Sequence, residues 1–213
     1  MIPLERHIDQ LQRWPRRGRH ILAQYDDNSV IVYQAYKPSI GTWAIRHQRL
    51  GGPDFSYSRM SWIKPNFLWM MYRSGWGAKK DQEMTLALRL PRSFFDAILK
   101  DAVESSFSAN IYKNREIWKN ALETSDVRLQ WDPDHGPQGK PEERRAIQLG
   151  LRNNYLKRMG EDVVLEIIDI SELVSDQFKK MQSGNPGELK TPVEQVYVPA
   201  DADVRDRLGL SEN

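Results

Sequence analysis

The chain has 213 residues, with 31 Lys and Arg against 29 Asp and Glu, so its formal net charge is only +2. It contains no Cys, which excludes disulfides, thiolate nucleophiles and Cys-based zinc sites. The longest apolar stretch is interrupted by Lys64 and Arg73, and the N-terminal residues do not have the pattern of a signal peptide. We therefore expect no membrane partner and an intracellular protein, either cytoplasmic or nuclear.

The small net charge conceals two regions of opposite sign. Residues 1–100 contain 16 basic and 8 acidic residues, whereas residues 101–213 contain 15 basic and 21 acidic residues. Within 37–80 there are eight basic residues and one acid, Asp54, interleaved with Trp, Tyr and Phe. Such a segment suits a surface that attracts phosphates and stacks bases. The alternative is that its aromatic residues form the core while its cations are solvated.

Apolar periodicity and turn residues predict the elements of the first half of the chain. These are a short helix over 4–14, a β-hairpin of strands 20–26 and 29–36, a helix over 38–47 and an alternating strand over 84–90. Between Pro65 and Gly75, residues 67–71 are apolar on every side, which is typical of a buried central helix. Arg59 and Lys64 precede this helix and Arg73 lies in its last turn, so a rigid core element would carry three cations.

The second half of the chain is predicted to mix helices with strands. The expected elements are a helix from Ser93 as N-cap to 103, a helix over 110–123 with Ile117 facing inward, a strand over 127–131, a loop over 132–141, a strand over 145–151, a helix over 153–159, a strand over 163–168 and a helix over 171–182. The mixture predicts an α+β protein whose sheet is mixed or antiparallel and packed by helices. We divide the chain into a basic N-terminal lead (1–18), a single α+β domain (19–184) and an extended C-terminal tail (185–213).

The basic residues around the central helix are the first candidate site. Arg59 and Arg73 could contact phosphates in a bidentate manner, and Lys64 would act as a point charge. Burial beside other cations would also lower the pKa of Lys64. A neutral lysine amine is a nucleophile, so Lys64 could form a covalent nucleotide adduct.

A second candidate site surrounds the predicted strand 127–131. Arg128 and Gln130 alternate on one face of this strand, directly before Asp132 and His135. Asp132 and His135 could transfer protons or bind a metal. The alternative is that they belong to a solvated turn.

Polar and aromatic residues on three other strands complete the candidate set. Arg145 and Gln148 would contact a nucleotide from the strand 145–151, although a separation of three residues directs them to opposite faces. Glu83 precedes the strand 84–90 and is either a catalytic acid or an ordinary solvated residue. Tyr33 and Tyr36 are expected to share one strand face, as core or as a stacking wall.

Long and unusual motifs carry a resemblance to a known family. These motifs are the runs 23–26, 32–36, 59–70, 73–77, 127–133 and 147–150. From about residue 19 to residue 197 the chain resembles the family labelled domain of unknown function four-two-nine-one. The resemblance implies that the Arg, Lys, Gln, Tyr, Trp and Glu residues at motif positions form an enzyme site. It also suggests a fold similar to that of NAD-using ADP-ribosyltransferases and an association with RNA end joining.

The function that we expect is phosphoryl or nucleotidyl transfer at RNA ends, by a transferase or ligase that uses ATP or GTP with Mg²⁺. The residues expected to hold the phosphates are Arg59, Lys64, Arg73 and Arg128. Asp132 or His135 would be the acid, the base or the metal-binding group.

Two alternatives follow from the same residues. The first is NAD-dependent ADP-ribosyl transfer, in which Glu83 is essential and Tyr33 or Tyr36 stacks on nicotinamide. The second is a non-catalytic module that binds single-stranded RNA, with strong salt dependence and no product.

Overall fold

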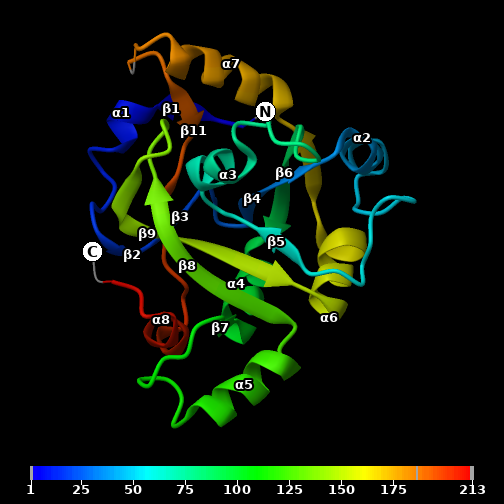
Figure 1. Ribbon diagram of the computed structural model, residues 1–213, viewed down its shortest axis with the longest axis vertical. Helices are drawn as coiled ribbons and strands as arrows, with labels where there is room; N and C mark the ends of the chain where they lie inside the picture. The colour runs from blue at the N-terminus through cyan, green and yellow to red at the C-terminus, as the bar shows by residue number, and fades with distance from the viewer. Residues whose placement is uncertain (1, 186, 212–213) are drawn as a thin grey trace.

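Two β-sheets form the framework of the protein in the computed structural model, which describes residues 2–185 and 187–211 (Figure 1). The strands are β1 (Leu4–Arg6), β2 (Gly18–Arg19), β3 (Ile21–Ala23), β4 (Ser29–Tyr36), β5 (Ser61–Ile63), β6 (Met84–Pro91), β7 (Val103–Glu104), β8 (Val127–His135), β9 (Pro141–Leu151), β10 (Glu166–Asp169), β11 (Lys190–Pro192) and β12 (Gln195–Tyr197). The helices are α1 (His7–Gln10), α2 (Pro38–His47), α3 (Phe67–Ser74), α4 (Arg92–Asp101), α5 (Arg115–Thr124), α6 (Asn153–Lys157), α7 (Ser171–Gln182) and α8 (Ala202–Leu208), with a π-helical segment at Arg158–Val163. The α+β prediction is confirmed.

The larger sheet contains both parallel and antiparallel pairs. Its strands follow the order β2-β9-β8-β7, and β5 also pairs with β9. The β2–β9 and β7–β8 pairs are parallel, whereas β8 and β5 run antiparallel to β9. The smaller sheet is antiparallel in the order β10-β6-β4. The two sheets meet where Tyr33 of β4 forms an antiparallel bridge with Lys64, directly after β5.

The main core lies between the two sheets. It contains Val30 and Val32 of β4, Leu129 and Leu149 of the larger sheet, and Phe95 of α4. A second apolar cluster forms on the opposite face of β4 and β6, where α3 and α7 cover the smaller sheet. In Figure 1, β8 and β9 cross the front of the molecule while α7 lies along its upper side. Successive side chains of β4 point to opposite faces of the sheet, so Val30 and Val32 enter the main core while Ile31 and Tyr33 enter the second cluster.

The central helix is buried as predicted, but it begins two residues later than Pro65. Asn66 is the N-cap, and its side-chain oxygen accepts a hydrogen bond from Trp69 N at 2.7 Å. Gly75 ends the helix in the left-handed conformation with φ of 59°, which glycine adopts without a Cβ penalty. The cap position is held by Asn66 and not by Pro65, because the asparagine side chain has an oxygen that accepts from the Trp69 N–H and the proline side chain has no acceptor.

Several local predictions are correct and others need correction. The helices over 38–47 and 171–182 have the predicted bounds, and the hairpin closes through Asp26 N and Ser29 O at 2.9 Å. The predicted helix over 4–14 is instead β1 followed by α1, because β1 pairs with β11. The predicted strand over 163–168 begins at Glu166, after the π-helical segment.

Two predicted helix starts were also wrong. α4 begins at Arg92, and its first residues have no side-chain cap, so Ser93 is not the N-cap. α5 begins after Asn114, whose side chain accepts from Ile117 N at 2.9 Å. Ile117 itself is 48% exposed rather than inward-facing.

The first and last described segments pack together. β1 pairs with β11, and β12 pairs with β3, so residues 190–197 run alongside the beginning of the chain. The buried side chain of Gln10 donates to Thr191 Oγ1 at 2.9 Å, and its oxygen accepts from Glu194 N at 2.8 Å. α8 follows within the segment that was predicted to be extended. Among the described helices, none combines the length and the apolar character needed to cross a bilayer.

Candidate functional site

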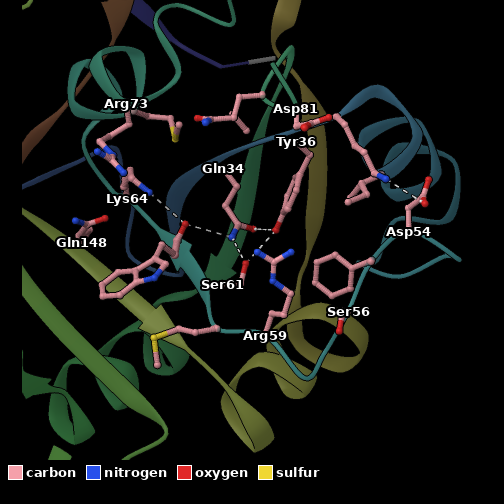
Figure 2. Close-up of a pocket in the computed structure, with 18 of the residues that line it drawn as sticks. Gln34, Tyr36, Asp54, Ser56, Arg59, Ser61, Lys64, Arg73, Asp81 and Gln148 are labelled. Carbon is pink, nitrogen blue, oxygen red and sulfur yellow. Dashed lines mark hydrogen bonds and ion pairs between the residues drawn. The ribbon is translucent and has the colours of Figure 1, made fainter. Parts of the chain in front are cut away.

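A cavity of about 870 Å³ opens beside the bridge between the two sheets. The end of β4 and the start of α2 form one wall, and α3 with the loop before β6 forms another. The polar residues that line it are Gln34, Tyr36, Lys37, Asp54, Ser56, Arg59, Ser61, Lys64, Arg73, Asp81, Gln82, Gln130 and Gln148. Figure 2 shows that Lys64 and Arg73 lie together on one side of Gln34, whereas Tyr36 lies on the other. Residues that are distant in sequence therefore converge on one polar cavity.

Lys64 is the most enclosed cation of this cavity. Its backbone N and O both bond to Tyr33, and its side chain is only 6% exposed. The Nζ atom donates to the Trp62 carbonyl at 3.4 Å (Figure 2). Burial lowers the pKa of Lys64 to about 8, assisted by the positive charge of Arg73 and opposed by the negative charge of Asp132. A substantial fraction of this amine is therefore neutral near physiological pH.

Arg59 and Arg73 supply exposed positive charge at the cavity. Arg59 comes from the loop before β5, and Arg73 comes from the last turn of α3. Neither guanidinium forms an ion pair with a carboxylate in the part of the chain that the structure describes. In contrast, Lys37 at the cavity edge pairs with Asp54 at 3.1 Å. Arg59 and Arg73 are thus available to an anionic ligand, whereas Lys37 is partly neutralised.

Two glutamine side chains fix the carboxylate of Asp132. Gln148 Nε2 donates to Asp132 Oδ2 at 2.7 Å, and Gln130 Nε2 donates to Asp132 Oδ1 at 3.0 Å. Gln130 and Gln148 are opposite each other in the β8–β9 register, so all three side chains share one face of the sheet. Asp132 lies within β8 and not in the predicted loop 132–141. Its charge acts on Lys64 from this fixed position.

A hydrogen-bonded group of neutral residues forms the cavity wall away from Lys64 and Arg73. The Tyr36 hydroxyl donates to Gln34 Oε1 at 2.9 Å and lies 3.1 Å from Ser61 Oγ, while Gln34 Nε2 donates to Ser61 Oγ at 2.7 Å. Burial raises the pKa of Tyr36 well above its ordinary value, so the hydroxyl stays neutral. Phe55 packs edge-on against the Tyr36 ring, with centroids 6.0 Å apart. This wall offers an aromatic surface with fixed amide and hydroxyl groups.

The predicted pairing of Tyr33 with Tyr36 on one strand face was wrong. Residues three apart on a strand point to opposite faces. Tyr33 is completely buried against Phe67 of α3, with ring centroids 5.5 Å apart, while Tyr36 lines the cavity. Tyr33 contributes to the cavity through its backbone bridge to Lys64 and not through its ring.

Three other candidates lie outside the cavity. Glu83 is exposed, and its Oε1 accepts from Asp81 N at 3.0 Å. Arg128 is half-buried on the same face of β8 as Gln130, as predicted, and its buried Nε has no partner among the described residues. Arg145 is exposed on β9, in register with Arg19 of β2. Only Gln148 of the predicted Arg145–Gln148 pair reaches the cavity, as their opposite faces require.

His135 is also separated from Asp132, although both belong to β8. Its ring stacks on Tyr72 with centroids 3.5 Å apart and planes inclined by 11°, and Trp69 stacks at 5.2 Å. Burial lowers the pKa of His135. Within residues 2–185 and 187–211, no three His, Asp or Glu side chains gather closely enough to hold a metal ion. His135 therefore packs an α3–β8 contact, apart from the residues that surround Lys64.

Sequence reasoning missed Gln34 and Ser61. A usable signal was present for Gln34, because it stands two residues from Tyr36 and so shares its strand face. Ser61 was not identifiable in this way, since its contact with Gln34 joins residues that are 27 positions apart.

A known protein family covers the part of the chain that forms the cavity. Residues 20–197 match the family described as Domain of unknown function (DUF4291), and the chain belongs to that family. No curated protein matches the chain. The matched range contains every residue named above as lining the cavity.

Proposed function

We propose that the protein is a nucleotide-dependent enzyme that transfers a nucleotidyl or phosphoryl group, with RNA ends as its acceptor. The observation that carries the proposal is the enclosed amine of Lys64, with its pKa of about 8, at the wall of a cavity that also presents Arg59 and Arg73. Pockets of about 300–1,000 Å³ suit small molecules and cofactors. A cavity of about 870 Å³ with free guanidinium groups supports a polyphosphate-bearing ligand.

The chemistry assigned to Lys64 is nucleophilic attack on the α-phosphorus of ATP or GTP. The neutral amine forms a nitrogen–phosphorus bond, the bond to the pyrophosphate leaving group breaks, and the amine proton passes to Asp132 or to water. Arg59 and Arg73 would stabilise the negative charge that develops on the phosphate oxygens. A second attack, by an RNA terminal phosphate on the adduct, would regenerate Lys64 and activate the RNA end.

Two carboxylates at or near the cavity could help to bind the Mg²⁺ of the proposed reaction. This ion usually binds through one or two carboxylates together with substrate phosphates. Asp81 lines the cavity, and Asp132 is close enough for its charge to act on Lys64. Such a set fits an ion that arrives with the nucleotide, and the ion would neutralise phosphate charge during transfer.

The second candidate is ADP-ribosyl transfer from NAD. The observation in its favour is that Asp81 and Gln82, which directly precede Glu83, line the cavity opposite an aromatic wall. Glu83 itself is exposed and lies outside the cavity lining. The geometry of the resting protein therefore favours Lys64 over Glu83 as the reactive group.

The experiment that tests the proposal uses nucleotides labelled at the α-phosphate. The protein is incubated with Mg²⁺ and labelled ATP or GTP without RNA, then resolved on a denaturing gel. We expect a labelled protein band that is lost in Lys64→Ala and Lys64→Arg but retained in Lys113→Ala, which changes an exposed lysine far along the chain. A parallel incubation contains labelled NAD in place of ATP or GTP. A labelled band that appears with NAD and with neither ATP nor GTP would favour the second candidate. RNA retardation without label from any nucleotide would favour the binding module and overturn the enzyme proposal.

A further inference from the structure

A second cavity, of about 770 Å³, lies at the arginine-rich segment near the start of the chain, which the proposed function does not use. It is lined by Arg13, Trp14, Arg16, Arg17, His20 and Ser211, among others. No residue lines both this cavity and the one around Lys64. We call it the arginine cleft, defined by residues 13–18 together with His20, Val196 and Ser211.

The segment that forms the arginine cleft is anchored by buried contacts. Trp14 is 6% exposed, and its Nε1 donates to the Glu194 carbonyl at 2.9 Å. The guanidinium of Arg144 lies 5.3 Å from the centre of the Trp14 ring and donates to the Pro15 carbonyl at 2.6 Å. Arg144 is held in turn by an ion pair with Asp134 at 2.6 Å, in which both side chains are almost fully buried. The segment is therefore a fixed loop.

The far end of the loop is fixed as well. His20 Nε2 lies 3.1 Å from the Arg17 carbonyl, and β2 follows immediately with parallel pairing to β9. Backbone positions on both sides of Arg16 and Arg17 are thus determined by the fold. Both side chains line the arginine cleft from a backbone that these contacts fix, which lowers the entropy cost of binding a ligand there.

The charges of the cleft have little internal compensation. Arg13 pairs with Glu5, but Arg16 and Arg17 are exposed and form no ion pair within the residues that the structure describes. Arg145 is exposed on the strand that pairs with β2, outside the cavity, and the exposed Glu143 lies two positions before it on the same strand face. Adjacent uncompensated arginines repel each other, and an anion with several charges relieves that repulsion. Two adjacent exposed guanidinium groups in one cavity fit a ligand whose phosphates repeat along its length.

We propose that the arginine cleft binds the phosphate backbone of single-stranded RNA, at a distance from its reacting end. The strand would contact Arg16 and Arg17 while its terminus reaches the cavity around Lys64. The identity of the strand as an acceptor rests on the proposed function, whereas the binding of RNA by the cleft can be measured without any reaction. Arginine contacts to phosphates position a nucleic acid without reading its sequence.

The test measures binding of a fluorescein-labelled 20-nucleotide single-stranded RNA by fluorescence anisotropy, without nucleotide, between 50 and 200 mM salt. The variants are Arg16→Ala/Arg17→Ala and a matched control, Lys113→Ala/Lys119→Ala, which removes two exposed positive charges from α5 and the turn before it. We expect the arginine variant to raise Kd at 50 mM salt by at least about 10-fold. In that variant the slope of the logarithm of the association constant against the logarithm of salt concentration should become less steep by about 1.4. Each of the two lost phosphate contacts on a single strand contributes about 0.7. The control should stay within about twofold of the unchanged protein.

Other results would overturn the inference. They are absence of RNA binding by the unchanged protein at 50 mM salt, an unchanged Kd in the arginine variant, or an equal loss in the lysine control. A competition arm with inorganic pyrophosphate distinguishes a strand from a small anion: displacement of the RNA at equimolar pyrophosphate would contradict a strand-binding cleft. Adduct formation at Lys64 without RNA is followed in parallel. If adduct is absent while RNA binding depends on Arg16 and Arg17, the proposed function fails and the cleft stands.

Discussion

Tyr33 and Lys64 exchange two backbone hydrogen bonds, from Tyr33 N to Lys64 O at 2.7 Å and from Lys64 N to Tyr33 O at 3.2 Å. This bridge joins the smaller sheet to the larger one. The Tyr33 ring enters the cluster under α3, whereas the Lys64 amine lines the cavity. The position of the amine is therefore set by the backbones of two sheets, which is the preorganisation that a nucleophile requires.

Replacement of Lys64 by Ala should abolish label transfer from ATP or GTP without unfolding the protein. The change removes a buried amine whose desolvation is unfavourable, so stability should stay the same or increase. Lys64→Arg should be equally inactive, because a guanidinium stays protonated at any usable pH. Label transfer is measured beside thermal unfolding of each variant. Full transfer by a folded Lys64→Ala protein would disprove the assigned role.

The pH dependence of adduct formation should report the charge state of Lys64. The rate should rise with pH and level off above about 8, because only the deprotonated amine attacks. Asp132→Asn removes a charge that raises the pKa of Lys64, so its midpoint should move to lower pH. Arg73→Ala removes a charge that lowers this pKa, so its midpoint should move to higher pH. Single-turnover rates from pH 6 to 10 would measure both midpoints, and shifts in the same direction would contradict this account.

Glu83→Gln should leave nucleotidyl transfer within about twofold of the unchanged protein, because Glu83 is exposed and lies outside the cavity lining. Under the NAD alternative the same substitution should eliminate product. Parallel lanes with ATP, GTP or NAD separate these outcomes. The amide oxygen of glutamine can still accept the hydrogen bond from the Asp81 N–H, so the folded state should tolerate the change.

Glu194→Gln should change the pH dependence of stability. Burial raises the pKa of Glu194 from 4.5 to about 8, assisted by the negative charge of Asp134 and opposed by the Phe67 N–H. Between those values the folded protein holds a proton that the unfolded chain has lost, so this contribution to stability is complete below 4.5 and is lost as the pH rises to about 8. His7, whose pKa burial lowers from 6.5 to about 4, acts in the opposite direction but only below 6.5.

The window from pH 6.5 to 8 lies above the titration of His7, but toward its upper end the folded protein also loses the Lys64 proton, which has the opposite effect on stability. The difference between the unchanged protein and Glu194→Gln therefore isolates Glu194. Relative to Glu194→Gln, the unchanged protein should lose up to about 1.4 kcal/mol of unfolding free energy per pH unit across this window, as measured by urea unfolding, because that is the free energy of one pKa unit. In Glu194→Gln this fall should be absent, and the free energy of unfolding should rise toward pH 8, because the folded protein releases the Lys64 proton there while the unfolded chain keeps it. Parallel pH curves for the two proteins would show that Glu194 is already ionised in the folded state.

The elements that were predictable from the sequence are those fixed by neighbouring residues. Pro38 at the start of α2 and Gly75 after α3 carry their own conformational preferences. The length of β8 was not predictable in this way, because Pro133 and the residues around it are typical of a turn. The strand accommodates Pro133 because β7 pairs with β8 only at positions 128 and 129, which leaves one side of Pro133 unpaired.

In the candidate site, too, residues that are neighbours in sequence were predictable and contacts between distant residues were not. The cations around Lys64 were identified because they cluster in the sequence, and three of them reach one cavity. The attachment of Asp132 to Gln148 depends on the β8–β9 register, which no local pattern specifies. The arginine segment was predicted as a basic lead, and its fixed conformation depends on distant contacts, such as that of Trp14 with the Glu194 carbonyl, which no local pattern specifies.

The link between Glu194 and the start of α3 has a consequence for biosynthesis. Glu194 accepts hydrogen bonds from Asn66 Nδ2 at 3.0 Å and from Phe67 N at 2.6 Å, across 128 and 127 positions of sequence. A growing chain exposes Lys64 to solvent before the ribosome has made residue 194. Contacts of such separation form late, after the local hairpins and helices. Lys64 should therefore acquire its buried environment late in folding, so a nascent chain would carry it as an ordinary charged amine.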